Sequence, residues 1–489
     1  MGLETYLRFY EQQWSELMES NDQGDTPLQD YPDRSVWTTW AISYQAIRHK
    51  HEHTAKLLLL WSFLDNNDLW HGLLAVACEA SAGAARMLSA WVGEIASSEL
   101  AFSRAIQLLR NYSLVEAVEA TASYATHPVV HRWAYHYQGK QSGKELGQIA
   151  VIAVGWAVPN QSVTNLSALQ RRLLPHAQAC SSWVLKSEPG RGLEGSEQRE
   201  LCFEEGEEVQ TLLVAIRNIG VLYAGQGKLA EAALLHELAL RGKEEVLGPK
   251  HILTLETVGS LGNVYMNQGR LAEADHTIKR ALQGFDNMLP PKHASRLRTF
   301  GNLGMVYKKQ GKLADAEPIF EQVLQEMEET LGPKHISTLV ALNNLGNLYK
   351  NQDKLAEAEH MLGRALRGKE ETLGPNHPST LQTIGNIGIV YKKQGKLAEA
   401  EQMYQWALRG KEEVLGPRRI ETLETVGNLG NLYVEQDKLP EAENMYKRAL
   451  EGFVEALGTG HASTQQIVIE LNAVRRRQGK FEETGQMFE

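Results

Sequence analysis

The sequence predicts an all-α protein in which a compact helical domain is followed by a solenoid of stacked helical hairpins. Two observations lead to this prediction. The C-terminal half repeats with a period of 42 residues, and glycine and proline separate its apolar segments at regular positions. The N-terminal half has no such period, but it holds nine of the ten tryptophans, and only Trp406 follows residue 190. The two halves are therefore expected to be different domains.

The bulk composition limits the possible functions. A chain of 489 residues is too long for one core. With 50 basic and 60 acidic residues the net charge is −10, which argues against nonspecific binding to nucleic acid or to an anionic membrane. Cys78, Cys180 and Cys202 lack disulfide spacing, and the longest apolar run, Ile149 to Val158, is too short to span a membrane. We expect a cytoplasmic protein without a cofactor.

One tyrosine marks the repeat. It recurs six times at intervals of 42 residues, and Arg475 takes its place in a degenerate seventh unit. The tyrosines are Tyr223, Tyr265, Tyr307, Tyr349, Tyr391 and Tyr433, each with a glycine three residues earlier and an alanine nine residues later. Apolar residues at i, i+3 and i+7 share one face of a helix. Each unit therefore predicts a helix A that packs through small residues against a helix B, while the tyrosine fills the space between hairpins.

Glycine, aspartate and proline mark the helix ends. Helix A is expected to stop at a glycine or aspartate, because both tolerate the left-handed backbone that ends a helix. In most repeats helix B is expected to begin at Leu-Ala-Glu-Ala, whose glutamate complements the helix dipole, and to end at Leu-Gly-Pro. Ser379 followed by Gln382 is interpreted as a capping box for the next helix A.

The third unit, Phe300-Gly-Asn-Leu-Gly-Met-Val-Tyr307 followed by Ala316-Glu-Pro-Ile-Phe320, resembles the tetratricopeptide signature. The common form of that repeat has about 34 residues, and the extra residues here fall in the second half of helix B and the following turn. With its run Leu373 to Leu381, this longer form resembles the kinesin-light-chain repeat. The resemblance covers roughly residues 209 to 489. It implies a right-handed superhelix of six repeats and a degenerate seventh that binds protein partners on its concave face.

Asparagines on helix A are the first candidate binding residues. They recur five residues before the tyrosine in one series and two residues before it in another. The candidates are Asn302, Asn344, Asn386 and Asn428 in the first series and Asn263 and Asn347 in the second. A side-chain amide both donates and accepts hydrogen bonds, which suits the backbone of an extended peptide. Bonding to a neighbouring helix within the array is an equal alternative for the first series.

Lysines after the tyrosine are the second candidates. Repeats three to five carry Lys308 and Lys309, then Lys350, then Lys392 and Lys393. On successive A helices these residues would form a basic stripe, which is suited to an acidic segment of a partner protein. A solvated helix end is the alternative explanation.

Histidine also recurs with the repeat, as His251, His293, His335, His377 and His461. Each histidine belongs to a separate turn and has no second ligand at short spacing. We therefore predict a structural role in the turn and no metal site.

The N-terminal half is predicted to be mainly helical. Ser35 to Ile47 is amphipathic, and Ala55 to Leu64 is almost entirely apolar and is expected to be buried. Asp65 to Asp68 predicts a turn, Phe102 to Leu109 a helix, and Ser113 to Val118 a short strand or helix.

Two segments of this half resemble the winged-helix part of fungal NLR-like proteins, which closes their nucleotide-binding module. The first runs from Tyr31 to Trp40 and continues at Leu58 to Asp65, and the second is Tyr124-Ala-Thr-His-Pro-Val-Val-His-Arg-Trp133. The resemblance covers roughly residues 3 to 186 and places His127 at the family's histidine that contacts bound ADP. In this motif Thr126 and Pro128 replace the family's methionine and aspartate.

These patterns predict four segments. They are an N-terminal helix within residues 1–30, a winged-helix-like helical domain over 31–145, a helical connector and linker over 146–206, and the repeat array over 207–489.

The sequence contains no G-x4-G-K-[ST] phosphate loop, and the nearest string, Gly139 to Glu145, is one residue short. Motifs for a serine nucleophile or a zinc site are also missing from the sequence. We therefore expect a protein-interaction scaffold and not an enzyme, related to NLR-like receptors but lacking their NTPase. The alternative is a nucleotide-linked switch in which another chain supplies the phosphate loop and His127 contacts the nucleotide.

Overall fold

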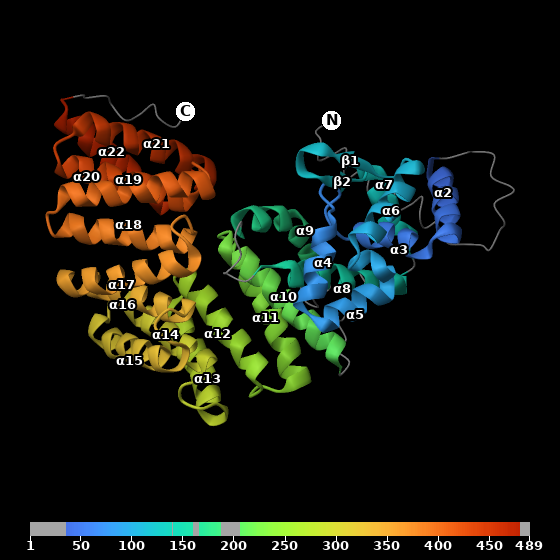
Figure 1. The fold of residues 1–489 in the computed structure, drawn as a ribbon, viewed down its shortest axis with the longest axis horizontal. Coiled ribbons are helices and arrows are strands. Elements are labelled where there is room, and N and C mark those ends of the chain that lie inside the picture. Colours follow the sequence, from blue (N-terminus) through green and yellow to red (C-terminus); the bar gives the residue numbers. More distant parts are fainter. Residues whose placement is uncertain (1–35, 139, 160–165, 187–205, 480–489) are drawn as a thin grey trace.

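The computed structural model describes residues 36–138, 140–159, 166–186 and 206–479. Figure 1 shows two parts, a cluster of helices drawn in blue and teal and a curved array of helices drawn from green to red. The predicted all-α fold with a C-terminal solenoid is confirmed. The helix expected within residues 1–30, most of the linker before Gly206, and Cys202 lie outside the described residues.

The N-terminal part consists of short helices and one small hairpin. Its helices are α2 (Val36–Lys50), α3 (Glu52–Trp61), α4 (His71–Ala80), α5 (Ala82–Val92), η1 (Gly93–Ala96), α6 (Glu99–Asn111), α7 (Pro128–Tyr137), α8 (Lys140–Ala157) and α9 (Leu166–Lys186). Between α6 and α7, strands β1 (Glu116–Val118) and β2 (Ser123–Ala125) pair antiparallel across the turn η2 (Glu119–Thr121). The expected helices at residues 35–47 and 102–109 are confirmed as α2 and α6.

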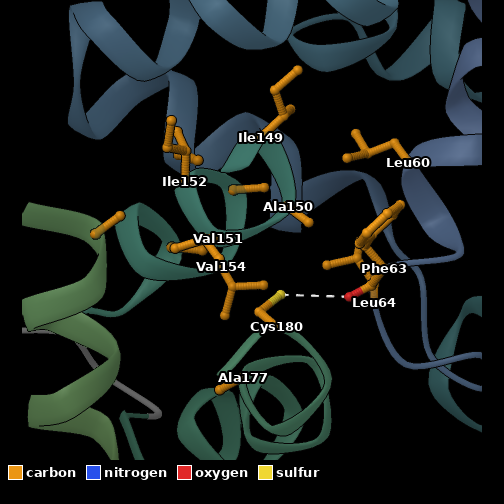
Figure 2. Close-up of a cluster of buried hydrophobic side chains, with 14 of the residues drawn as sticks. Leu60, Phe63, Leu64, Ile149, Ala150, Val151, Ile152, Val154, Ala177 and Cys180 are labelled. Carbon is orange, nitrogen blue, oxygen red and sulfur yellow. Dashed lines mark hydrogen bonds between the residues drawn. The ribbon is translucent and has the colours of Figure 1, made fainter. Parts of the chain in front are cut away.

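The core of this part surrounds α3 and α8. The second half of each helix is apolar on every side and can be buried all round, and the side chains from Leu57 to Trp61 and from Ile149 to Val154 are buried. Figure 2 shows part of this core, in which Leu60 of α3 and Ala150 and Val154 of α8 lie near Phe63 and Cys180. The Cys180 thiol donates to the Phe63 carbonyl oxygen over 3.6 Å. Burial raises the pKa of this thiol, which therefore stays protonated and packs as a small apolar group.

Helix α9 is fastened to the N-terminal core by polar contacts. Arg172 donates two hydrogen bonds to the Asp68 carboxylate, at 2.7 and 2.8 Å, and its guanidinium lies 3.9 Å from the centre of the Trp70 ring. The Asp65 backbone N–H donates to His176 Nδ1 over 3.1 Å. These bonds join residues that are 104 and 111 positions apart in the sequence, so they hold two distant chain segments together.

The array alternates helices A and B. Its A helices are α10 (Glu207–Gly225), α12 (Ile252–Asn267), α14 (Ala294–Lys309), α16 (Ile336–Asn351), α18 (Pro378–Lys393), α20 (Ile420–Glu435) and α22 (Ala462–Arg477). Its B helices are α11 (Leu229–Leu247), α13 (Leu271–Met288), α15 (Leu313–Leu331), α17 (Leu355–Leu373), α19 (Leu397–Val414) and α21 (Leu439–Leu457). Each B helix follows its A helix as a hairpin, at the positions that the repeat predicts.

The glycine before each tyrosine allows helices A and B to pack closely, as predicted. A Cβ atom on Gly304 would lie 3.0 Å from the Phe320 ring, and one on Gly388 would lie 2.8 Å from the Tyr404 ring. The residues that end helix A have a left-handed backbone, with φ of 78° at Gly311 and 63° at Asp353. The short Cβ distances at Gly304 and Gly388 show why a larger side chain at the glycine position would push helices A and B apart.

The capping box predicted at Ser379 and Gln382 is wrong. The residue that caps α18 is His377, whose Nδ1 accepts a hydrogen bond from the Ser379 backbone N–H over 3.1 Å, while Pro378 occupies the first helical position. The imidazole accepts from a free N–H group of the first turn, which is the role of a cap. Because Pro378 is the first helical residue, Ser379 is already inside the helix. His251, His293, His335 and His461 cap their helices in the same way.

The tyrosine joins each repeat to its neighbours. A lysine or arginine five residues later lies over each tyrosine ring, 4.2 to 5.6 Å from its centre. The hydroxyls of Tyr265 and Tyr349 donate to Glu237 and Glu321 on the preceding B helix, at 2.9 and 2.8 Å. The tyrosine therefore fills the space between hairpins, as predicted.

Ion pairs between B helices occur at every second boundary. Arg280 pairs with Glu244, Arg364 with Glu328, and Arg448 with Glu412. At the two intervening boundaries the arginine position holds Gln322 and Trp406. These bonds thus join α11 to α13, α15 to α17, and α19 to α21.

The N-terminal part and the array share one core. Helix α8 crosses α10 so closely that a Cβ atom on Gly155 would lie 2.4 Å from the Ala215 carbonyl oxygen. The Tyr223 hydroxyl of the first repeat bonds to the Ser181 hydroxyl of α9 at 2.5 Å, so α9 stands where a preceding B helix would stand. A single cluster of buried apolar residues extends from Tyr44 to Phe285. The first two repeats are therefore continuous with the N-terminal part.

Candidate functional site

The A helices line the inner face of the curved array. Consecutive A helices, from α10 to α20, contact one another more extensively than consecutive B helices do. In a bent stack the helices on the inside are the closer ones, so the concave face is made by helix A. All of the predicted binding residues lie on A helices and so belong to this part of the array.

The predicted lysines meet on this face. Lys308, Lys350 and Lys392 occupy equivalent positions on α14, α16 and α18, and all three side chains are partly buried. Burial lowers the pKa of Lys350 to about 8, with further lowering by the positive charges of Lys308 and Lys393. Burial also lowers the pKa of Lys308, and the neighbouring Lys309 adds to this effect. The charges of Lys308 and Lys393 therefore act on Lys350.

Acidic residues compensate part of the lysine group. Lys392 pairs with Glu435 at 2.9 Å, and Lys393 pairs with Asp353 at 3.1 Å. Lys350 donates to the Asn347 amide oxygen over 3.0 Å. Within the described residues no ion pair reaches Lys308 or Lys350. The uncompensated charge is therefore centred on repeats three and four.

The asparagines divide into two groups. Asn386 donates to Asn343 on the neighbouring A helix over 3.3 Å, which is the bond within the array that was the alternative explanation. Asn302, Asn344 and Asn428 are partly exposed, and in the described part of the chain no side-chain hydrogen bond reaches them. The Asn263 amide oxygen is buried without a partner among the described residues. Asparagine therefore serves the array in one repeat and is free for a ligand in others.

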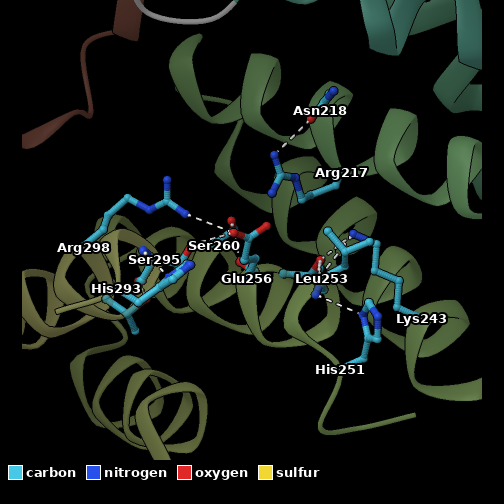
Figure 3. A network of polar contacts seen from close by, with 12 residues as sticks. Arg217, Asn218, Lys243, His251, Leu253, Glu256, Ser260, His293, Ser295 and Arg298 are labelled. Atoms are coloured by element: carbon cyan, nitrogen blue, oxygen red, sulfur yellow. Dashed lines mark hydrogen bonds and ion pairs between the residues drawn. The ribbon is translucent and has the colours of Figure 1, made fainter. Parts of the chain in front are cut away.

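A second charged group lies on the same face, nearer the N-terminal end. Figure 3 shows Arg217, Glu256 and Arg298, which come from three successive A helices. Glu256 accepts a hydrogen bond from Ser295 over 2.8 Å and lies 3.7 Å from the Arg298 guanidinium. Burial lowers the pKa of Arg217, and its Nε has no partner among the described residues. Sequence reasoning missed these residues because they do not recur. Comparison of the variable positions between repeats would have found them.

Buried lysines on the B helices were also missed. The ammonium groups of Lys243, Lys369 and Lys411 each donate to a threonine hydroxyl on the next A helix over 2.8 Å. Burial lowers the pKa of Lys243 to about 7 and that of Lys369 to about 8. The same position holds Phe285, Met327 and Phe453 in the other three repeats. These lysines thus replace apolar core residues and connect neighbouring repeats.

His127 has a structural role in the N-terminal part. It is the N-cap of α7, and its Nδ1 accepts a hydrogen bond from the Val129 backbone N–H over 3.3 Å. This ring nitrogen is therefore engaged within the protein. Across the described residues there is no group of three or more His, Cys, Asp or Glu side chains placed to hold a metal ion. None of the helices in the described ranges has the length and apolar character to cross a membrane.

Comparison with known proteins identifies the repeats. A family model described as a tetratricopeptide repeat matches residues 210–287, 295–371 and 351–413, and a second model with the same description matches residues 422–463. This part of the chain therefore consists of tetratricopeptide repeats. No curated protein matches the sequence.

Several solved structures are similar to the chain. A putative kinesin light chain from Podosopora anserina with nearly identical TPR-like repeats is 22% identical, with 42% of this chain and 97% of that chain covered and a TM-score of 0.37. A Rap protein complexed with competence and sporulation factor is 13% identical, with 82% and 99% covered and a TM-score of 0.45. A signal-transduction ATPase with a tetratricopeptide-repeat sensor from Pyrococcus horikoshii is 14% identical, with 98% and 67% covered and a TM-score of 0.43.

Proposed function

From its array of tetratricopeptide repeats, we propose that this protein is a non-enzymatic scaffold that captures a partner protein on the concave face. The observation that carries the proposal is the pair Lys308 and Lys350, partly buried lysines at equivalent positions on the neighbouring A helices α14 and α16, with no acidic partner among the described residues. Burial lowers the pKa of Lys350, and the charge of Lys308 lowers it further. Two like charges in a partly buried site repel one another. An acidic group of a bound partner would relieve that repulsion.

We further propose that the partner offers an extended acidic segment. The half-exposed amides of Asn302 and Asn344 lie on the same two A helices as the lysines. An amide can pair with both the N–H and the C=O of an extended backbone, whatever its sequence. The lysines would then select acidic side chains, and the asparagines would hold the main chain. The net charge of −10 of the whole chain disfavours nucleic acid as the ligand.

The test is a charge-neutralising variant with a matched control. Affinity capture and mass spectrometry identify the partner, and its most acidic segment is then titrated as a fluorescent peptide. We expect Lys308→Gln/Lys350→Gln to weaken binding by roughly tenfold or more, because each lysine loses a charge-assisted hydrogen bond. The control, Lys292→Gln/Lys334→Gln, removes the same charge from exposed turn lysines that pair with Glu329 and Glu371.

Equal loss of affinity in both variants would show a general charge effect and contradict a specific site. Unchanged affinity in the first variant would remove the lysine pair from the binding surface. Far-UV circular dichroism of both variants confirms that the array remains folded.

We further propose that the protein is cytoplasmic. We also propose that its N-terminal part is related to the winged-helix part of NLR-like proteins, without their NTPase module in this chain. The support is the pair of sequence motifs together with the hairpin β1–β2, which follows α6 in the chain as a wing follows its helices, with the Tyr124 ring centroid 6.0 Å from that of Phe102 on α6. His127 in this proposal stabilises α7 and does not read a nucleotide. The nucleotide titration described in the Discussion tests this assignment.

A further inference from the structure

One repeat departs from the pattern at the start of helix A. The residue before the helix is histidine in five repeats, but it is Arg419 in front of α20. Each of the five histidines accepts a hydrogen bond from the first turn of its helix. Arg419 has no acceptor to offer, and its side chain makes no cap bond. Helix α20 therefore lacks the local contact that the five histidine-capped helices have. The Arg419 side chain can form hydrogen bonds with more distant residues instead.

Arg419 reaches the other end of the array. Its guanidinium Nη1 donates to the Gln226 side-chain oxygen over 3.4 Å, although the two residues are 193 positions apart. Gln226 is the residue that ends α10, the first A helix. Figure 1 shows how this contact is possible, since the array runs from α10 down to α13 and then returns through α16 to α20. The first and sixth repeats thus meet across the curve.

We propose that Arg419 and Gln226 form a latch that closes the array into a ring around its concave face. A partner that is already folded then reaches this face only when the latch opens, whereas a chain end can be threaded through. The contact itself is independent of the proposed function, and only its consequence for entry rests on that function.

The latch is suited to reversible opening. The bond is long, its acceptor is an uncharged amide, and Arg419 also lies 3.5 Å from Glu421 on its own helix. The Arg419 Nε is buried and has no partner among the described residues. Opening exchanges the bond to Gln226 for bonds to water and keeps the pair with Glu421, so neither state is strongly favoured. Ligands that fit one state better would shift the population.

Cross-linking tests the contact in the full-length chain. The double variant Gln226→Cys/Arg419→Cys is treated with a short bis-maleimide, and a cross-link is detected by altered gel mobility. The matched control is Gln226→Cys/His377→Cys, which moves the second cysteine by one repeat and keeps the native cysteines. We expect at least tenfold faster cross-linking in the first variant. Equal rates in the two variants would overturn the latch.

A second experiment tests whether the latch controls entry to the concave face. Arg419→His installs the residue that the other five repeats use, so it should fold at least as well as the parent. We expect this variant to have a larger maximum dimension in small-angle X-ray scattering, and Gln226→Glu to have a smaller or equal one, because the added carboxylate attracts the guanidinium. A cysteine at Asn302 should react severalfold faster with a polyethylene-glycol maleimide in the Arg419→His background. Unchanged labelling would contradict control of entry by the latch, even if the cross-link forms.

Discussion

The two parts of the molecule are held together by different kinds of contact. In the array, apart from the contact between Arg419 and Gln226, polar bonds between repeats join residues at a short and recurring separation, such as the 36 positions between Arg280 and Glu244. In the N-terminal part, Arg172 bonds to Asp68 across 104 positions. Repeats that contact only their neighbours contribute to stability as a sum of local terms. A core closed by distant segments is lost as a unit. The junction formed by α8, α9 and α10 determines how many repeats unfold together with the N-terminal core.

Tryptophan makes this comparison measurable. Nine of the ten tryptophans precede residue 190, so tryptophan fluorescence reports mainly on the N-terminal part, while far-UV circular dichroism is dominated by the helices of the array. Urea unfolding followed by both signals separates the stability of the two parts. Each prediction below states which signal should move.

The largest effect is expected at the junction. In Gly155→Leu the new Cβ collides with the backbone of Ala215 on α10, and backbone cannot move aside as a side chain can. We expect a loss of about 3 kcal/mol or more in the free energy of unfolding. Both signals should shift together, because one core spans the junction. A shift of the fluorescence signal alone would mean that the first repeats do not depend on the N-terminal part.

A smaller effect is expected inside the array. Gly304→Leu forces the side chain against Phe320 and should cost about 1–3 kcal/mol. Circular dichroism should report this loss, with the fluorescence transition nearly unchanged. The control is Gly385→Ala, a glycine in α18 whose added Cβ meets nothing within 4 Å. Replacement there should stabilise by about 1 kcal/mol through helix propensity. If Gly304→Leu melts like the parent, helix packing has been assigned wrongly.

The buried lysines predict an effect of pH on the array. Because the pKa of Lys243 is about 7 in the folded chain and lies at 10.5 ordinarily, the unfolded chain binds more protons between these values. The free energy of unfolding should therefore rise as pH increases from 7 to 9.5. Lys243→Met, which installs the residue found at Met327, should stabilise by about 1–2 kcal/mol at pH 7 and reduce this slope. An unchanged slope would show that folding does not lower the pKa of Lys243.

The smallest effect is expected at His127. His127→Ala removes the cap of α7 and should cost about 1 kcal/mol, seen in fluorescence and not in circular dichroism of the array. ADP or ATP should leave the melting temperature of the parent unchanged. Stabilisation by nucleotide that disappears in the variant would instead establish the nucleotide-linked switch.

Periodicity explains why the array was predictable and the rest was not. The positions of glycine, tyrosine and alanine repeat six times, so a packing rule inferred at Gly304 holds at Gly388 as well. The helices α2, α3 and α6 also followed from local pattern. The bond between Arg172 and Asp68 had no such signal, because it depends on how two distant segments meet. The binding face was predicted only where its residues recur, which is why Arg217 and Glu256 were missed.

Prediction from local sequence also failed where a residue that seldom caps a helix takes the N-cap position. Ser379 has the sequence of a helix cap, but the histidine two positions earlier occupies that place and leaves the serine inside the helix. Arg419 could be recognised as an exception in the repeat, while its partner Gln226 could not. A contact across 193 positions follows from the curvature of the whole array and not from any one segment.

The alternating ion pairs have a mechanical consequence. Arg280, Arg364 and Arg448 tie the middles of the B helices at every second boundary, so the six repeats form three doublets. The two intervening boundaries are joined nearer the helix ends, by Lys292–Glu329 and Lys396–Glu359. Resistance to bending should then be higher within a doublet than at the boundaries near Gln322 and Trp406. A boundary that is tied near the helix ends can pivot more easily than one that is also tied between the middles of its helices. An opening of the ring would therefore bend the array more at those two boundaries than within a doublet.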